Sequence, residues 1–237
     1  MNLIAIVRDT NCAVTKQILD YEPSESNNWN PTKVESKEDL NTLLAQKLQV
    51  NNCIAIQGPP GTGKTYRMAA LSAELLRQGK SVLVTALTNQ ALIELVKKKD
   101  LKDFLDAQKV TKTSLTVDES KELPKLQPNK KNLCNAAPGY LSLATFYLSS
   151  AWAKDAIEIP FDYVIMDEAS QALYPMIAAS VKLGNKIIWI GDQNQLPPIV
   201  LTGDDVINRY DWGGIVKGFN TLCTNFSYPS YMLKDTF

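Results

Sequence analysis

Histidine is absent from this chain of 237 residues. Its absence excludes every mechanism that needs an imidazole, including Ser-His-Asp triads, histidine-assisted cysteine nucleophiles and zinc sites with histidine ligands. The four cysteines, Cys12, Cys53, Cys134 and Cys223, stand far apart and form no Cys-x-x-Cys pair. We therefore expect no zinc and no disulfide framework, and we interpret the cysteines as isolated core thiols.

Net charge is also absent, because 25 lysine and arginine residues balance 25 aspartate and glutamate residues. A neutral chain offers no general electrostatic attraction to nucleic acid. A local groove can still be basic on a neutral protein, so the balance does not exclude a nucleic-acid partner.

Long hydrophobic runs are missing as well. No apolar run approaches the roughly 18 to 20 residues that a membrane span needs. The short apolar stretch at the start meets Arg8 and Asp9 at once and lacks the parts of a signal peptide. With 45% hydrophobic and 21% charged residues, the composition is that of a globular protein. We expect no membrane partner and a cytoplasmic location, or a nuclear one in a eukaryote.

What the sequence does contain, from residue 53 on, is an alternation of short apolar runs with segments of helical spacing. The runs at 53–56, 81–86, 163–166 and 186–190 predict buried parallel strands. The helical patterns cover 39–48, 64–77 with a stop at Gly79, a stretch that Thr88 caps, and 171–183 with a stop at Gly184. The alternation predicts an α/β fold with a mostly parallel central sheet flanked by helices. Ligands in such folds bind at the carboxyl ends of the strands.

Two regions are less regular. Residues 1–38 suggest strands at 3–7 and 13–21 and then a polar stretch at 22–37, typical of a linker or of the remnant of a flanking element. Residues 97–131 are rich in lysine and have a mixed pattern, which we interpret as an insertion with some helix.

The strongest motif is GPPGTGKT at residues 58–65, between a predicted strand and a predicted helix. It fits the phosphate-binding pattern G-x-x-x-x-G-K-[ST], and its context is the one that the pattern requires. The glycines let successive N–H groups turn inward toward an anion at the start of the helix. Lys64 is expected to reach the β- and γ-phosphates, and the Thr65 hydroxyl is expected to bind Mg²⁺.

Two further motifs follow apolar strands. Asp167 and Glu168 end the run at 163–166, where a phosphate-loop enzyme needs one carboxylate for Mg²⁺ and one for the attacking water. The sequence GDQNQLPP at 191–198 follows the next strand. A glutamine there could bind the γ-phosphate, and a surface loop stiffened by proline is the alternative interpretation.

Together, GPPGTGKT, DEASQA at 167–172 and GDQNQLPP resemble the signatures of superfamily 1 helicases. The form is similar to the branch that includes the nonsense-mediated-decay helicase and the helicase–nuclease of Okazaki-fragment processing (superfamily 1B). The resemblance covers roughly residues 40 to 237 and implies a RecA-like P-loop ATPase domain that acts on DNA or RNA.

The residue roles that the resemblance implies fall into four sets. The catalytic set is Lys64, Glu168 and Gln195, the last as the γ-phosphate sensor, and the Mg²⁺ ligands are Thr65 and Asp167. The nucleotide-binding set is Gly58, Pro59, Pro60, Gly61, Thr62, Gly63, Lys64, Thr65, Tyr66 and Gln195, with Gln46. The contacts to the nucleic-acid backbone are Thr88, Asn89 and Thr145, although Thr88 and Asn89 fit a helix cap equally well.

Some features depart from the family's pattern. The glutamine that reads the adenine is expected upstream of the phosphate loop, and Gln46 lies closer to it than expected. Gln49 is a rival, and an ordinary helix surface is a third interpretation. At the end of the chain, residues 233–237 match the opening of the family's second RecA-like domain up to an aromatic residue, and an arginine would follow.

These patterns divide the chain into a flanking segment at 1–38, one RecA-like domain at 39–232 and the start of a second at 233–237. We expect a helicase or translocase motor that uses ATP and Mg²⁺, with single-stranded DNA or RNA and a second RecA-like domain as partners. Because the resemblance covers only the first of the family's two RecA-like domains, we expect this chain alone to be a weakly active ATPase. The alternative is a regulatory or scaffold module that binds nucleotide as a switch without motor activity.

Overall fold

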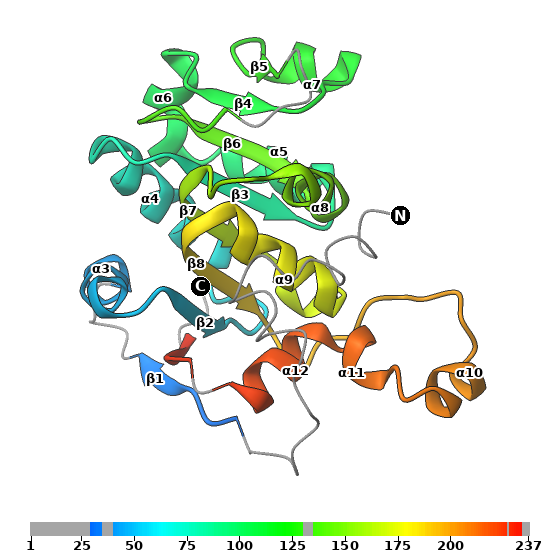
Figure 1. Ribbon diagram of the computed structural model, residues 1–237. Coiled ribbons are helices and arrows are strands. Elements are labelled where there is room, and N and C mark those ends of the chain that lie inside the picture. The colour runs from blue at the N-terminus through cyan, green and yellow to red at the C-terminus, as the bar shows by residue number, and fades with distance from the viewer. Residues whose placement is uncertain (1–28, 35–39, 130–134, 227, 234–237) are drawn as a thin grey trace.

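A computed structural model of the chain describes residues 29–34, 40–129, 135–226 and 228–233. The described strands form one sheet in the order β1-β9-β2-β8-β7-β3-β6-β4-β5, and every pairing is parallel. In Figure 1 the sheet runs from β5 at the top to β1 at the bottom. The strands are β1 (Thr32–Val34), β2 (Cys53–Gln57), β3 (Val82–Ala86), β4 (Val110–Lys112), β5 (Gln127–Pro128), β6 (Leu141–Thr145), β7 (Phe161–Met166), β8 (Gly184–Gly191) and β9 (Ser230–Leu233).

Helices cover both faces of this sheet, as a parallel sheet requires. One face carries α3 (Leu40–Val50), α4 (Lys64–Arg77) and α5 (Asn89–Val96), and the other carries α8 (Phe146–Asp155), α9 (Tyr174–Leu183) and α12 (Gly218–Asn225). Shorter elements are η1 (Lys99–Leu101), α6 (Lys102–Asp106), α7 (Val117–Glu122), η2 (Ala169–Gln171), α10 (Asp204–Arg209) and α11 (Gly213–Val216).

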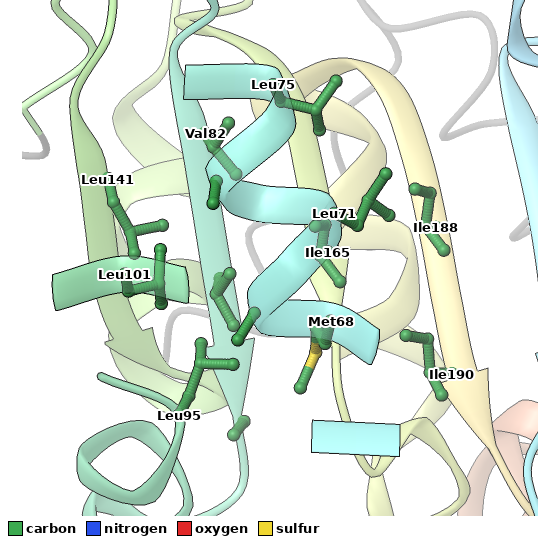
Figure 2. Packing of buried hydrophobic residues seen from close by; sticks show 14 of the residues in the cluster. Met68, Leu71, Leu75, Val82, Leu95, Leu101, Leu141, Ile165, Ile188 and Ile190 are labelled. Atoms are coloured by element: carbon green, nitrogen blue, oxygen red, sulfur yellow. The ribbon is translucent and has the colours of Figure 1, made fainter. Parts of the chain in front are cut away.

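The central strands show why both faces are covered, because successive side chains point to opposite sides and both sets are apolar. In β8, Ile188 and Ile190 join the hydrophobic cluster under α4, whereas Ile187 and Trp189 join the cluster under α9 and α12. Figure 2 shows the first cluster, with Met68 and Leu71 of α4 over the strands. The core therefore lies in two layers, one on each side of the sheet.

The strands predicted from apolar runs are confirmed as β2, β3, β7 and β8. The helix predicted at 64–77 is α4 with the same bounds, and Gly79 follows it in the left-handed conformation at φ +72°. The helix predicted at 171–183 begins only at Tyr174, because residues 169–171 form the turn η2 and Pro175 occupies the first helical turn. The predicted stop is confirmed, because the helix ends at Leu183 with Gly184 as its C-cap residue, which has an extended backbone and opens β8.

Two regions differ from the sequence interpretation. Within the stretch expected to be a linker, Thr32–Val34 forms β1 and pairs with β9, so this segment belongs to the sheet. Residues 97–129 contribute η1, α6, β4, α7 and β5, and β4 extends the sheet by pairing with β6. The strands predicted at 3–7 and 13–21 lie outside the described residues. Leu233 ends β9, and residues 234–237 are also outside.

None of the helices within the described ranges is both long enough and apolar enough to cross a membrane.

A buried ion pair holds the edge formed by residues 97–129. The Lys112 side chain of β4 is 1% exposed, and its Nζ donates to the carbonyl oxygen of Ser114 at 2.7 Å and to Glu119 Oε2 at 3.1 Å. Glu119 also completes the capping box at the start of α7, where it and Thr116 exchange hydrogen bonds. One carboxylate therefore neutralises a buried cation and caps a helix.

We predict that Glu119→Ala lowers the free energy of unfolding by about 3 to 5 kcal/mol, because it leaves the Lys112 charge buried and unpaired. Glu122→Ala is the matched control, since Glu122 pairs with Lys97 at the surface and such pairs contribute about 0 to 1 kcal/mol. Urea denaturation of both variants measures the difference. Equal losses in the two variants would contradict the role given to the buried pair.

Candidate nucleotide-binding site

The loop at 58–65 connects β2 to α4 and is shaped by two glycines with positive φ. Gly61 has φ +79° and Gly63 has φ +67°, a region that side chains with a Cβ avoid. Gly63 is the N-cap of α4 and has no side-chain cap. The N–H groups at the start of α4 are therefore available to an anion, and the helix dipole favours one there.

Side chains of the loop make hydrogen bonds within it. Lys64 Nζ donates to the carbonyl oxygen of Gly58 and, at 3.3 Å, to that of Pro59. The buried Thr62 hydroxyl donates to the same Pro59 oxygen at 2.8 Å. The lysine side chain thus folds back across the loop and holds its ammonium group over the turn, while Thr62 fixes the loop's curvature.

Asp167 lies at the carboxyl end of β7 and is 5% exposed. Its backbone N–H donates to the Thr85 carbonyl of β3 at 2.9 Å, and its Oδ1 accepts from the backbone N–H of Glu168 at 2.9 Å. Burial raises the pKa of the Asp167 carboxyl from 3.8 to about 6, against the lowering effects of the Glu168 N–H bond and the nearby Lys64 charge. Because β2 and β7 both pair in parallel with β8, the phosphate loop and the acidic strand end lie at the same edge of the sheet.

Glu168 follows in the left-handed conformation, at φ +53°. A non-glycine residue there is uncommon, and such backbone strain occurs at functional sites. The turn ends β7 abruptly and begins η2, so that Glu168 is partly exposed while Asp167 is buried. The two adjacent carboxylates therefore have different environments, which suits two different roles.

The loop after β8 is tied to the phosphate loop by Gln57 and Asp192, two residues for which the sequence analysis gave no role. Gln57 Nε2 donates to Asp192 Oδ1 at 2.6 Å, and Gln57 Oε1 accepts from the Gln193 N–H at 3.2 Å. The Gly58 N–H donates to the Gly191 carbonyl at 2.8 Å. Both side chains are buried. The sequence feature that could have identified Gln57 is its position as a polar residue at the end of an otherwise apolar strand.

The remaining nucleotide candidates lie at varied positions. Gln195 is partly exposed in the loop after β8. Tyr66, in the first turn of α4, is 42% exposed, and Lys99 Nζ lies 5.5 Å from its ring centroid, a cation–π contact. Gln46 and its rival Gln49 are both exposed on α3. Gln46 lies on the side of α3 opposite the buried Leu44 and Leu48, and its role in binding adenine stays a prediction.

The three candidates for nucleic-acid contacts lie at neighbouring strand ends, because Ala86 of β3 pairs with Thr145 of β6. Thr88 is exposed and caps α5, accepting from the Ala91 N–H at 3.2 Å, so the capping interpretation of Thr88 is confirmed. Asn89 is exposed, and Thr145 is partly exposed at the start of α8. The structure thus gathers them at the edge of the sheet that carries Asp167.

The donor set suits a hard divalent cation. Thr65 and Asp167 offer oxygen ligands, which Mg²⁺ prefers, and a buried carboxylate with a raised pKa is stabilised in its charged form by a cation. Within the described ranges, no three Asp, Glu or Cys side chains gather as a metal site. Mg²⁺ commonly binds through one or two protein oxygens and completes its coordination with phosphate oxygens and water, so the two residues fit that ion with a bound triphosphate.

We predict that the contribution of Asp167 to the free energy of unfolding falls by on the order of 3 kcal/mol between pH 4 and pH 6 when divalent cations are absent. The unfolded Asp167 ionises near pH 4, but the folded form holds its proton until about pH 6. The native state binds more protons in this window, so stability decreases as pH rises, at about 1.4 kcal/mol per pKa unit. The Asp167→Asn variant should lack this decrease with pH and should have a higher free energy of unfolding than the unmodified protein at pH 7. The Asp155→Asn variant, which changes an exposed carboxylate, should keep the decrease. Chemical denaturation across pH tests both, and an unchanged slope in Asp167→Asn contradicts the assignment.

Comparison with known proteins places this geometry in a family. A family model described as AAA domain matches residues 41–204. The chain is 27% identical over 200 residues to the DNA replication ATP-dependent helicase/nuclease DNA2 of Saccharomyces cerevisiae, covering 77% of this chain and 12% of that protein. It is 30% identical over 176 residues to the DNA replication ATP-dependent helicase/nuclease dna2 of Schizosaccharomyces pombe, covering 69% of this chain and 12% of that protein. Among solved structures, the UvsW helicase of bacteriophage T4 has a TM-score of 0.49 at 14% identity, covering 93% of this chain and 66% of that one.

The chain therefore spans about an eighth of the length of these curated relatives, at 12%. Their names agree with the helicase–nuclease part of the resemblance, while the narrower link to the nonsense-mediated-decay helicase stays a prediction. The family match extends over well more than half of the 237 residues. We conclude that this chain belongs to the AAA domain family.

Proposed function

We propose that this domain binds Mg·ATP and that its hydrolysis drives a helicase or translocase along single-stranded nucleic acid. The observation that carries the proposal is the convergence of three loops at one edge of a parallel sheet. The loop after β8 is joined to the end of β2 by the 2.6 Å Gln57–Asp192 bond, and β7, which ends at Asp167, pairs with β8 on its other side. The names of the curated relatives favour DNA over RNA as the nucleic acid.

The roles in hydrolysis follow from where each group lies. Lys64 would bind the β- and γ-phosphates, and the N–H groups of the loop would surround them. Thr65 and Asp167 would hold Mg²⁺, which supplies charge neutralisation for the phosphoryl oxygens. Glu168, less buried than Asp167 and held by its turn, would orient and deprotonate the attacking water. Gln195 would hydrogen-bond the γ-phosphate.

The nucleic acid would cross the sheet edge at the ends of β3 and β6. Thr88, Asn89 and Thr145 bring hydroxyl and amide groups there, which suit phosphate and sugar contacts that carry no sequence information. Capping of α5 by Thr88 uses one lone pair of its hydroxyl and leaves its proton available to a phosphate oxygen.

A second RecA-like domain would close the nucleotide site in the whole protein. The described domain supplies a phosphate cradle, oxygen ligands for Mg²⁺ and a base, but the charge that develops on the γ-phosphoryl oxygens also needs a cation. An arginine from another domain commonly supplies it, and such arginines raise turnover by about 10³ to 10⁵ in related enzymes.

The experiment that tests the proposal is phosphate release by the whole protein with and without single-stranded DNA and RNA. The motor interpretation requires strong stimulation by nucleic acid. A nucleotide switch without motor activity would hydrolyse ATP at the same rate in both conditions, and that result would replace the proposal.

We predict that Lys64→Ala weakens ATP binding by at least about 100-fold without unfolding the domain, because hydrogen bonds to charged groups contribute about 1.5 to 3 kcal/mol each. Calorimetric titration of ATP, with and without Mg²⁺, measures the loss. Lys109→Ala is the matched control, since Lys109 is an exposed lysine just before β4, at the opposite edge of the sheet. Unchanged affinity in Lys64→Ala would remove the lysine from the site.

Glu168→Gln should leave ATP binding intact and lower turnover of the whole protein by at least about 100-fold, the usual scale for loss of a general base. Asp167→Asn should instead weaken the binding that depends on Mg²⁺. Steady-state phosphate release and ATP titrations on the two variants distinguish the roles. The reverse pattern would show that the two carboxylates are wrongly assigned.

A further inference from the structure

Gln57 is a polar residue in a place that favours an apolar one. It ends β2, whose side chains are all buried and are apolar at the other four positions, and it is 0% exposed. A buried amide adds little net stability compared with an apolar side chain of the same shape, because it gives up its hydrogen bonds to water. The presence of Gln57 is therefore better explained by the geometry that it imposes than by the stability that it adds.

The Gln57 amide is held in one orientation by an acceptor and a donor. Its Nε2 donates to Asp192 Oδ1 at 2.6 Å, and its Oε1 accepts from the Gln193 N–H at 3.2 Å. Turning the amide over would set its oxygen against a carboxylate and its NH₂ group against an N–H, and both contacts are repulsive. The amide therefore fixes the loop after β8 at two points, directly before Gly58, where the phosphate loop begins.

Asp192 carries this constraint on to Gln195. Its Oδ1 also accepts from the Asn194 N–H at 3.0 Å, and its carbonyl oxygen accepts from the Gln195 N–H at 3.0 Å. With the bond from Gln193 to Gln57, each of the three successive N–H groups at 193–195 thus has an acceptor. A turn bonded in this way has little backbone freedom, so the backbone of Gln195 has a defined place relative to the end of β2.

The side chain of Gln195 lies next to open space. It is partly exposed and lines a cavity of about 190 Å³ at the start of α12, together with Ser170 and Phe219. A fixed backbone beside a cavity lets this side chain turn toward a ligand without displacing the loop. This combination suits a group that has to respond to a single phosphate.

We propose that Gln57 is a positioning residue, which sets the place of Gln195 relative to the phosphate loop and so lets the site distinguish a triphosphate from a diphosphate. The proposal rests on the proposed function, because it uses Gln195 as the group that binds the γ-phosphate. Both ends of the Gln57 amide are occupied by Asp192 and Gln193, so Gln57 acts through the loop after β8 and not on the nucleotide itself.

The test compares the binding of ADP and of a non-hydrolysable ATP analogue to the whole protein, both with Mg²⁺, by calorimetric titration. In Gln57→Leu the affinity for the analogue should fall about tenfold, the scale of one lost hydrogen bond to a charged group, while the affinity for ADP changes less than about twofold. Gln78→Leu is the matched control and should change neither, since Gln78 is an exposed glutamine at the far end of α4. Equal losses for the two nucleotides, or an unchanged ratio of the two affinities, would overturn the proposal.

Gln195→Ala separates this proposal from the function on which it rests. That variant should also lower the affinity for the analogue about tenfold. Adding Gln57→Leu to it should lower the affinity by no more than about twofold further, because the two residues act in series. Effects that multiply would show that Gln57 acts elsewhere and would overturn its positioning role alone. If Gln195→Ala leaves the affinity unchanged, the γ-phosphate contact in the proposed function fails, and the positioning role fails with it.

Gln57→Glu keeps the shape of the side chain and makes the positioning depend on a proton. The new carboxyl would lie 2.6 Å from the Asp192 carboxylate, and two such groups share one proton rather than both being charged. The shared proton restores the lost donor. ATP turnover of this variant, relative to the unmodified protein at the same pH, should therefore rise about tenfold as the pH falls from about 8 to about 6, whereas the ratio for Gln57→Leu should stay constant.

Comparison at the same pH removes the contributions of Lys64 and Asp167, the other charged groups of the site, because both proteins contain them. A merely structural glutamine would give the two variants the same profile. A ratio for Gln57→Glu that does not change with pH would contradict the Gln57–Asp192 bond as the positioning contact.

Discussion

The hydrogen bond between the Gln57 amide and the Asp192 carboxylate is the interaction on which the nucleotide site depends. It joins the ends of β2 and β8, which are paired in register up to Gln57 and Gly191. Besides the backbone pairing, the phosphate loop and the loop that carries Gln195 are connected by this bond and by the weaker bond from the Gln193 N–H to Gln57 Oε1. Because Gln57 is buried, replacing Asp192 would leave the Gln57 amide N–H without its acceptor, which is destabilising, whereas Asp192 Oδ1 also accepts from the Asn194 N–H at 3.0 Å. The alignment of the phosphate loop with the γ-phosphate sensor proposed at Gln195 is therefore built into the core of the sheet.

The site also keeps a carboxylate in a place that disfavours its charge. Burial raises the pKa of Asp167, and neither the Glu168 N–H bond nor Lys64 fully offsets the effect. Such a group is tolerated in a folded domain when a ligand supplies the missing positive charge. The structure is thus expected to be tighter and more stable with Mg·nucleotide bound, since a ligand that binds only the native state stabilises it by mass action.

The sequence predicted the centre of this fold better than its edges. Strands β2, β7 and β8 are buried on both faces, so their sequences are continuous apolar runs, and α4 has a glycine stop that fixes its end. In contrast, β4 and β5 have three and two residues, too few for a periodic pattern, and β1 lies in a polar segment that is a strand only because β9 is beside it. The late start of α9 reflects η2, a turn that follows from the strained backbone of Glu168 and that no local propensity indicates.

The site shows the same division. The motifs at 58–65 and 167–168 could be located from sequence because their residues are contiguous in the chain. Each motif forms one turn, so its spacing in the sequence reflects its shape. Gln57 could not be identified, since its role depends on Asp192, 135 positions later in the chain. The close approach of Gly218 to Ala172 and Tyr174 is likewise a tertiary contact that the local sequence does not indicate.

These long-range contacts give the loop after β8 an unusual position. Gln193 donates its N–H to Gln57 on the side of the phosphate loop, and its side chain and that of Gln195 line the cavity at α12. The loop after β8 therefore lies between the phosphate loop, which it contacts through Gln57, and the segments η2 and α12 on the other face of the sheet.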